Sequence, residues 1–350
     1  ITGILFLWLI LKIHPFLHQI WLAILGRLGK AREGFSAGIE VRFRDDLLRH
    51  VQKQHIAAPL FSLDEIALEP FLLAPPPEIN LEEQTPLVSS ASYILPFLPD
   101  WPELGSNLNA PTLTLTEILQ GSKGTYSNFA IVGHPGTGKT FALSHLASIV
   151  ARQQPEAGNL GNLLPIFVHI ADLNLHEYKN SDPIDTLVNA LSLITSAFTQ
   201  PRLSRLLNKA FSDGRILFLL DGVDELPTHD VDIAISYVGE LLTLYPRTRT
   251  LVATSTEYFD ALIDFGFAPI PMGTWSEYHR QQLIDIWSNL WNTHIISDEQ
   301  ENDYKVEQEL IKNWLLDENA AFTPLEFTIK VWAAFSGDTL GPSASDAIEA

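Results

Sequence analysis

Short runs of consecutive apolar residues alternate with longer segments of helical periodicity through the middle of the chain. The runs are Phe129–Val132, Ile166–Ile170, Ile216–Leu220 and Thr250–Thr254. Continuous apolar runs of this length are typical of strands covered on both faces of a parallel sheet. The helical segments are Asp182–Phe198, Arg202–Phe211, Asp230–Leu244, Glu277–Trp291 and Asp303–Leu316. Strands that alternate with helices over this length predict an α/β fold, with a parallel sheet flanked by helices.

The first eleven residues, Ile1–Leu11, are almost wholly apolar. As a helix they would rise about 16 Å, roughly half of a hydrocarbon core. From Ile13 to Leu28 the apolar residues recur at helical spacing, with a polar opposite side that includes His14 and His18. We therefore interpret residues 1–32 as the tail of a membrane span followed by an interfacial amphipathic helix. A buried core helix and a signal-peptide remnant remain the alternatives.

Basic residues follow this apolar stretch, at positions 27, 30 and 32. The positive-inside bias then places the rest of the chain in the cytoplasm. His14 and His18 have a spacing that could ligate a metal, but no third ligand is near them in the sequence, so we interpret them as polar-face residues. The chain begins without an initiator Met, and we expect it to be a piece of a longer protein.

Residues 33–111 form a connector in this interpretation. Val41–His55 could be a short helix. From Pro70 to Pro111 the proline density disfavours both helices and central strands. Several apolar residues remain there, which favours an extended segment that wraps against a neighbouring domain over a plain tether. The chain has no internal repeat of the solenoid kind.

The composition of the chain disfavours or excludes several classes of function. The chain has 350 residues, enough for two domains and a linker, and its net charge is −20. A chain this acidic disfavours general binding to nucleic acid. The absence of cysteine excludes disulfides, thiol nucleophiles and Cys-ligated metals. A hydrophobic content of 46% with 18% charged residues excludes a disordered chain.

The first apolar run leads directly into a phosphate-binding motif. The sequence is Gly133-His134-Pro135-Gly136-Thr137-Gly138-Lys139-Thr140, which matches G-x-x-x-x-G-K-[ST], and a helical pattern follows it. Gly136 and Gly138 allow the backbone to turn its N–H groups around a phosphate. Lys139 would reach the β- and γ-phosphates, and the Thr140 hydroxyl would coordinate Mg²⁺. The side chain of His134 has no assigned role.

A second motif lies at the end of a later strand. The run Arg215–Asp221 ends in an acid, which would hold Mg²⁺ through water beside the phosphate loop. Asp224 and Glu225 follow, and either could orient or deprotonate the water that attacks a phosphate. Which of the two acts stays open, with Asp224 preferred, and one of them could instead only cap the turn before Pro227.

These two motifs resemble those of NACHT-type NTPases, members of the STAND class of P-loop signalling ATPases. Gly222 stands where this family has a small residue after the metal-binding Asp, and the resemblance covers roughly residues 112–335. It implies binding of ATP/ADP, less often GTP, with Mg²⁺, and a sheet of order 5-1-4-3-2. It also implies a switch between ADP-bound and ATP-bound states.

The resemblance also implies a division of the chain, with a P-loop NTPase core at 112–274 and the start of a small helical lid domain at 275–350. Thr323-Pro324-Leu325 resembles the lid segment whose proline packs on the base of the nucleotide, and a plain helix start with Pro324 in its first turn is equally open. One departure is Thr256, which stands where the family usually has a phosphate-sensing Arg.

The sequence therefore favours slow ATP hydrolysis by a nucleotide-switched signalling NTPase that is tethered to a membrane and assembles into a homo-oligomer on activation. An AAA+-like mechanical ATPase and a nucleotide-binding scaffold with little hydrolysis remain the alternatives.

Overall fold

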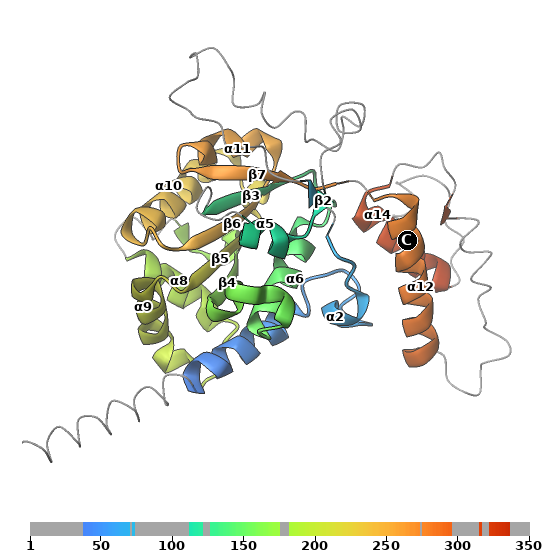
Figure 1. Ribbon diagram of the computed structural model, residues 1–350, viewed down its shortest axis with the longest axis horizontal. Coiled ribbons are helices and arrows are strands. Elements are labelled where there is room, and N and C mark those ends of the chain that lie inside the picture. The colour runs from blue at the N-terminus through green and yellow to red at the C-terminus, as the bar shows by residue number, and fades with distance from the viewer. Residues whose placement is uncertain are drawn as a thin grey trace, which may run out of the picture.

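The computed structural model describes residues 38–70, 72–73, 112–121, 127–175, 182–273, 275–295, 315–316 and 322–336. A five-stranded parallel sheet of order β4-β5-β6-β3-β7 forms its centre (Figure 1). The strands are β3 (Asn128–Val132), β4 (Leu164–His169), β5 (Ile216–Asp221), β6 (Arg249–Thr254) and β7 (Phe267–Pro271). If the strands are numbered along the chain with β3, which precedes the phosphate loop, as strand 1, the order read from β7 to β4 is 5-1-4-3-2. The predicted α/β fold and strand order are confirmed.

Helices cover both faces of this sheet. They are α5 (Leu115–Gly121), α6 (Lys139–Ala151), α8 (Pro183–Ser192), α9 (Leu203–Asp213), α10 (Thr228–Leu244) and α11 (Thr256–Ile263). From β3, in the interior of the sheet, the chain passes to the edge strand β4. The next two strands, β5 and β6, lie successively closer to β3. Because parallel crossovers are right-handed, α6 lies on one face, and α8, α10 and α11 lie on the other (Figure 1). The carboxyl ends of β3 and β5 therefore meet at one edge, beside the start of α6.

Shorter elements complete the core. The 3₁₀ turns are η3 (Pro155–Asn162), η4 (Ile170–Asp172), η5 (Gln200–Arg202) and η6 (Val223–Glu225), and β1 (Leu72–Leu73) pairs antiparallel with β2 (Thr112–Leu113). All six residues of β5 are buried, as expected for the apolar run that ends in Asp221. The main hydrophobic core lies between this strand and the helices on either side.

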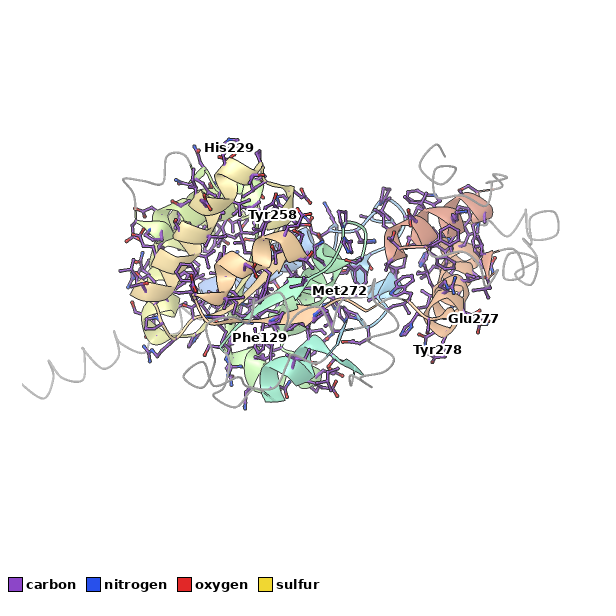
Figure 2. All side chains as sticks on the ribbon, turned by 90° about the horizontal axis from the view of Figure 1, so that it is seen from above. Phe129, His229, Tyr258, Met272, Glu277 and Tyr278 are labelled. Carbon is purple, nitrogen blue, oxygen red and sulfur yellow. The ribbon has the colours of Figure 1, made fainter. Side chains whose placement is uncertain are left out.

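A second hydrophobic core lies beside the first. It joins α2 (Leu63–Ile66) to α12 (Glu277–His294) and α14 (Pro324–Phe335) around the fully buried Trp287. In Figure 2 the labelled residues Glu277 and Tyr278 lie on this smaller lobe, and Met272 lies between it and the sheet. The residues of α2 come from the predicted connector, so the second core is built from both ends of the described chain.

The helix at 38–51 also comes from the predicted connector, and it packs into the main core through residues that include Phe43 and Leu47. Two buried polar side chains fix its position. Arg44 donates to the carbonyls of Val150, at 2.9 Å, and Leu163, at 2.6 Å. The division of the chain into domains stays a prediction, but residues 38–70 are folded against both cores.

Asp46 is the second of these polar groups, and it is 3% exposed. Its carboxylate accepts hydrogen bonds from the Ser196 N–H, at 3.0 Å, and from the hydroxyls of Ser196 and Thr199, at 2.9 and 2.8 Å. Arg49 pairs with it as well. Burial raises the pKa of Asp46, but these hydrogen bonds and the Arg49 charge outweigh it, and the pKa is lowered overall.

We expect Asp46 to make stability depend on pH in the acid range. Because its folded pKa is lowered, its contribution is complete above about pH 4–5, near the ordinary pKa of an unfolded Asp, and is lost as the pH falls through the folded value. Asp46→Asn should cost about 1–3 kcal/mol at pH 7 and reduce the acid slope in urea titrations between pH 7 and pH 3. Asp45→Asn, on the exposed side of the same helix, should leave both unchanged, and an equal effect of the two variants would contradict this role.

Three sequence expectations differ from the structure or lie outside it. The helix predicted at 182–198 begins as expected, with the Asp182 carboxylate accepting from the Ile184 N–H at 2.8 Å, but α8 ends at Ser192. The fifth strand that the resemblance implied was not located in the sequence; it is β7, which contains Pro269 and Pro271 and is an edge strand, where a missing N–H costs little. Most of the helix predicted at 303–316 lies outside the described residues.

The predicted membrane segment at 1–32 lies outside the described residues too. Within the part of the chain that the structure describes, no helix has the length and apolar character to cross a bilayer.

Candidate functional site

The loop between β3 and α6 has the conformation that its glycines predict. Gly136 and Gly138 have φ values of +81° and +95°, which a side chain would strain. The Lys139 ammonium folds back and donates to the carbonyls of Gly133, at 2.8 Å, and His134, at 3.0 Å. The helix α6 begins at Lys139, so its N-terminal N–H groups face the same space as the loop amides. This arrangement is a cradle for an anion.

Three acids stand opposite this loop. Asp221 ends β5 and is 2% exposed. Burial raises the pKa of its carboxyl above the ordinary value for an aspartate, and a hydrogen bond with the Thr140 hydroxyl and the nearby His169 offset only part of this rise. Asp224 forms an ion pair with Lys139, with 3.0 Å between its Oδ2 and the Nζ. The Asp221 Oδ2 is buried and has no hydrogen-bond partner within the described ranges. A buried carboxylate oxygen of this kind, beside a hydroxyl, is suited to a divalent cation.

Glu225 has a different partner from Asp224. Its side chain is 66% exposed, and its Oε2 lies 3.4 Å from Nε2 of His169, the last residue of β4. The two neighbouring acids of η6 therefore have different partners: Asp224 faces the P-loop lysine, and Glu225 faces the imidazole.

The start of α14 lies directly over the phosphate loop. The Leu325 N–H donates to the Gly136 carbonyl at 3.1 Å. Thr323 caps the helix by accepting from the Glu326 N–H at 3.3 Å, and Pro324 occupies its first turn. The segment is an ordinary helix start with Pro324 in its first turn, and it also contacts the P-loop through the Leu325 N–H. The interpretation as a plain helix start and the interpretation as a lid segment are therefore compatible.

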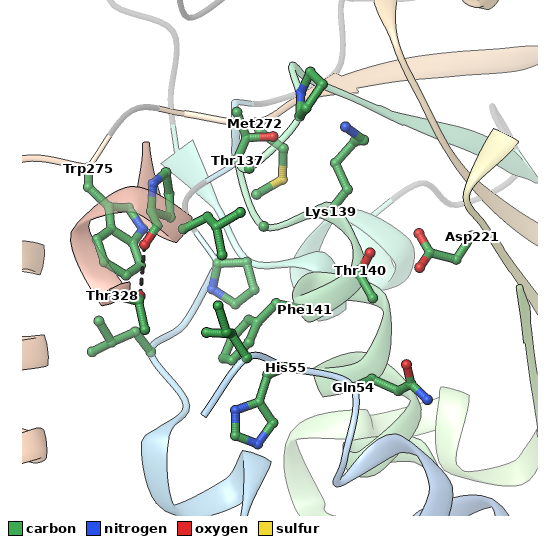
Figure 3. A pocket seen from close by; sticks show the side chains of 18 of the residues that line it. Gln54, His55, Thr137, Lys139, Thr140, Phe141, Asp221, Met272, Trp275 and Thr328 are labelled. Carbon is green, nitrogen blue, oxygen red and sulfur yellow. Dashed lines mark hydrogen bonds between the residues drawn. The ribbon is translucent and has the colours of Figure 1, made fainter. Parts of the chain in front are cut away.

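A single cavity of about 450 Å³ joins these parts (Figure 3). The end beside the loop between β3 and α6 is lined by Pro135–Thr140 with Asp221, Asp224 and Glu225. Figure 3 shows Lys139, Thr140 and Asp221 at this end and Trp275 and Thr328 at the other, with the Thr328 hydroxyl donating to the Pro324 carbonyl at 2.7 Å. The remaining walls are mostly apolar and include Ile56, Ile66, Leu68, Pro70, Phe141, Met272, Leu283 and Leu325. The volume is in the range of ordinary small-molecule sites, which run from about 300 to 1,000 Å³.

Most of the predicted site residues come together in this cavity. Pro135, Gly136, Thr137, Gly138, Lys139, Thr140, Asp221, Asp224, Glu225 and Pro324 all line it. Gly133 and His134 are not among the lining residues and contribute their carbonyls to Lys139. Thr256 is not among them either; it begins α11.

Sequence reasoning missed the wall that residues 54–56 and 66–70 provide. These residues lie in the predicted connector, and nothing local marks them as a binding surface. It also missed His169, which was included only as one residue of a strand. Its position at the carboxyl end of a parallel strand, level with Asp221 on the neighbouring strand, is the signal that could have found it.

Comparison with known proteins agrees with this geometry. The sequence profile of the NACHT domain matches residues 127–287, a little under half of the chain. No curated protein sequence matches the chain significantly.

Several solved structures are distantly similar. A DNA replication initiation factor is 18% identical, with a TM-score of 0.37, over 68% of this chain and 63% of that one. C. elegans PCH-2 is 14% identical, with a TM-score of 0.33, over 66% and 55%. A structure described as the basis of katanin self-assembly is 16% identical, with a TM-score of 0.31, over 78% and 90%. The chain thus spans less than two thirds of the first two proteins. Residues 127–287 are similar to a NACHT domain, and their fold is that of a P-loop NTPase.

Proposed function

We propose that this chain binds ATP, or alternatively GTP, with Mg²⁺ and hydrolyses it slowly, as a nucleotide-switched signalling NTPase. The observation that carries this proposal is the cavity, which has a cationic and amide-lined cradle at one end and an apolar chamber at the other. A nucleotide has the same two-part character, with a polyanionic tail and a flat, largely apolar base.

The phosphate end would hold the tail through the loop amides, the N-terminus of α6 and Lys139. This lysine is the only Lys or Arg among the cavity-lining residues that the structure describes. In the structure its ammonium has three partners, Asp224 and two loop carbonyls. Phosphate oxygens would replace Asp224 as the partner, because they bring more negative charge to the same ammonium.

Mg²⁺ would be held by the Thr140 hydroxyl and the Asp221 carboxylate, whose free Oδ2 suits a hard cation. The ion would neutralise charge on the β- and γ-phosphates.

Hydrolysis would proceed by attack of a water oxygen on the γ-phosphorus. The bond from that phosphorus to the bridging oxygen breaks, and its electron pair leaves with the β-phosphate of ADP. One water proton passes to a carboxylate, Asp224 or Glu225, and from there to the released phosphate. We expect a slow rate, because Thr256 supplies no positive charge for the transition state and the cavity has no arginine among the residues described.

The proposal also covers the oligomerisation of the protein and its location in the cell. An arginine from a second copy of the chain could supply the missing charge, which would couple hydrolysis to homo-oligomerisation on activation. The apolar segment at 1–32 supports a membrane-associated protein with the NTPase domain in the cytoplasm.

The proposal predicts that the nucleoside contributes to binding independently of the phosphates. Ile56 lines the apolar chamber and is 41% exposed, so Ile56→Ser should not unfold the protein. We expect it to weaken Mg²⁺–ATP binding by about three- to tenfold, the loss of roughly 1 kcal/mol of apolar contact. Binding of inorganic tripolyphosphate should stay unchanged.

Isothermal titration with ATP, GTP and tripolyphosphate would measure this difference. Leu244→Ser is the matched control, since Leu244 is 53% exposed on α10 and does not line the cavity. Failure of the unmodified protein to bind either nucleoside triphosphate would overturn the proposed function. Equal binding of ATP and tripolyphosphate would leave a phosphate site without a nucleoside site.

A further inference from the structure

Glu225 and His169 form a contact that the nucleotide-binding motifs do not explain. His169 ends β4 and is paired in register with Asp221 at the end of β5. Its Nδ1 accepts a hydrogen bond from the Ala171 N–H at 3.2 Å. In a neutral imidazole the other nitrogen, Nε2, then carries the hydrogen. That nitrogen is the one that lies 3.4 Å from the Glu225 carboxylate.

Gly222 makes room for this ring. It has a φ of +78°, and a β-carbon placed on it would lie 2.5 Å from Cε1 of His169 and closer still to Nε2. The glycine after Asp221 therefore serves two purposes. It allows the backbone to turn into η6, and it leaves the space that the imidazole fills on its way to Glu225.

Asp224, the other acid of η6, already forms an ion pair. Asp224 is mostly buried and has 3.0 Å between its Oδ2 and the Lys139 ammonium. Glu225 is exposed to solvent and lines the cavity, so water reaches it directly. An acid that activates water must be open to water and must be held in one place. Of the two acids, Glu225 meets the first condition, and its contact with His169 supplies the second.

We propose that His169 is a positioning residue that holds the Glu225 carboxylate, through Nε2–H, in the place from which it activates the attacking water. This inference rests on the proposed hydrolysis of a nucleoside triphosphate and names the acid and its partner. The proton of the attacking water passes to Glu225 and then to the released phosphate, while His169 keeps its own hydrogen throughout. His169 is not among the residues that line the cavity, so we expect it to affect turnover and to leave nucleotide binding unchanged.

Substitutions of His169 separate this role from a purely structural one. His169 also caps η4 through Nδ1, and asparagine can keep that cap while being too short to reach Glu225. Glutamine can place an amide donor near the position of Nε2. We expect His169→Asn and His169→Ala to lower kcat about tenfold with unchanged affinity for ATP. His169→Gln should retain most of the activity.

Gly222→Ala offers an independent test. The added methyl group should displace the imidazole and lower kcat about as much as His169→Ala does. In the His169→Ala protein the same substitution should cost no further activity, because no ring remains to be displaced. Any strain from the positive φ affects stability equally in both backgrounds and is measured separately by urea unfolding.

A double-mutant cycle, with kcat and the affinity for ATP measured for every protein, completes the design. His169→Ala should have no further effect on kcat in a Glu225→Gln background, whereas its effect should persist in an Asp224→Asn background. Full activity of His169→Asn, or equal coupling of His169 to both acids, would overturn the inference. If the unmodified protein binds ATP without turning it over, this inference fails and nucleotide binding stands; if it binds no nucleotide, the proposed function fails as well.

Discussion

Replacing Lys139 with methionine should weaken binding of Mg²⁺–ATP by about 100-fold or more and remove measurable hydrolysis. Methionine keeps much of the length of the side chain and removes its charge. Each charged hydrogen bond to a phosphate contributes about 1.5–3 kcal/mol, and a 100-fold loss corresponds to about 2.7 kcal/mol. The protein supplies little other positive charge at this end, where Asp221, Asp224 and Glu225 all line the cavity.

Titration calorimetry and phosphate release would measure the two effects. Lys209→Met is the matched control, because Lys209 is exposed on α9 and is not among the cavity-lining residues. It makes the same change in net charge, so a general electrostatic effect would appear in both proteins. Urea unfolding of both variants would show that binding is compared between folded proteins. Unchanged ATP binding by Lys139→Met would show that the loop between β3 and α6 is not the phosphate site.

The parts of the site that the sequence predicted are those fixed by local rules. The P-loop needs glycines at two positive φ angles, a preceding buried strand and a following helix, and all of these can be recognised in a short stretch of sequence. Asp221 could be placed because a parallel strand brings its carboxyl end to the same edge as the P-loop. The start of α8 followed from a capping Asp and a proline.

The parts that the sequence did not predict depend on contacts between distant residues. Glu40 and Arg44 look like ordinary surface residues of a mixed helix. In the structure Glu40 pairs with Arg215 across 175 positions, and Arg44 reaches carbonyls more than 100 positions away. Such pairing allows buried charge at the helix 38–51, but it leaves no periodic signal. The early end of α8 has a similar cause, since Ser196 and Thr199 bind Asp46 instead of continuing the helix.

The cavity wall from residues 54–70 was missed for a related reason. This segment is too short and irregular to predict as an element, and only its packing against α12 and α14 gives it a fixed place. The second hydrophobic core and the apolar end of the cavity share Ile66, Leu68 and Leu283. Stability of the second core and the shape of the binding chamber are therefore properties of the same side chains.

Trp287→Ala should accordingly cost about 3–5 kcal/mol of unfolding free energy, the usual cost of removing a large buried aromatic side chain. Trp287 is fully buried, and its ring packs edge-on against Phe61 at a centroid distance of 5.3 Å and lies 6.1 Å from Trp332. It thus connects the segment before the P-loop to both α12 and α14. Urea unfolding followed by circular dichroism would measure the loss.

Tyr278→Ala is the matched control, an aromatic truncation on the same helix where the side chain is exposed, and it should change stability by no more than about 0.5 kcal/mol. Saturating Mg²⁺–ATP should raise the unfolding free energy of the unmodified protein by about 2.7 kcal/mol at 100 times Kd. At that same ATP concentration the gain should be smaller for Trp287→Ala, because loss of packing in the second core would move Leu283 and the apolar wall of the cavity and so raise the Kd for ATP. Equal unfolding midpoints for Trp287→Ala and Tyr278→Ala would mean that Trp287 does not stabilise the second core. A full ATP gain in the destabilised variant would mean that this core does not contribute to nucleotide binding.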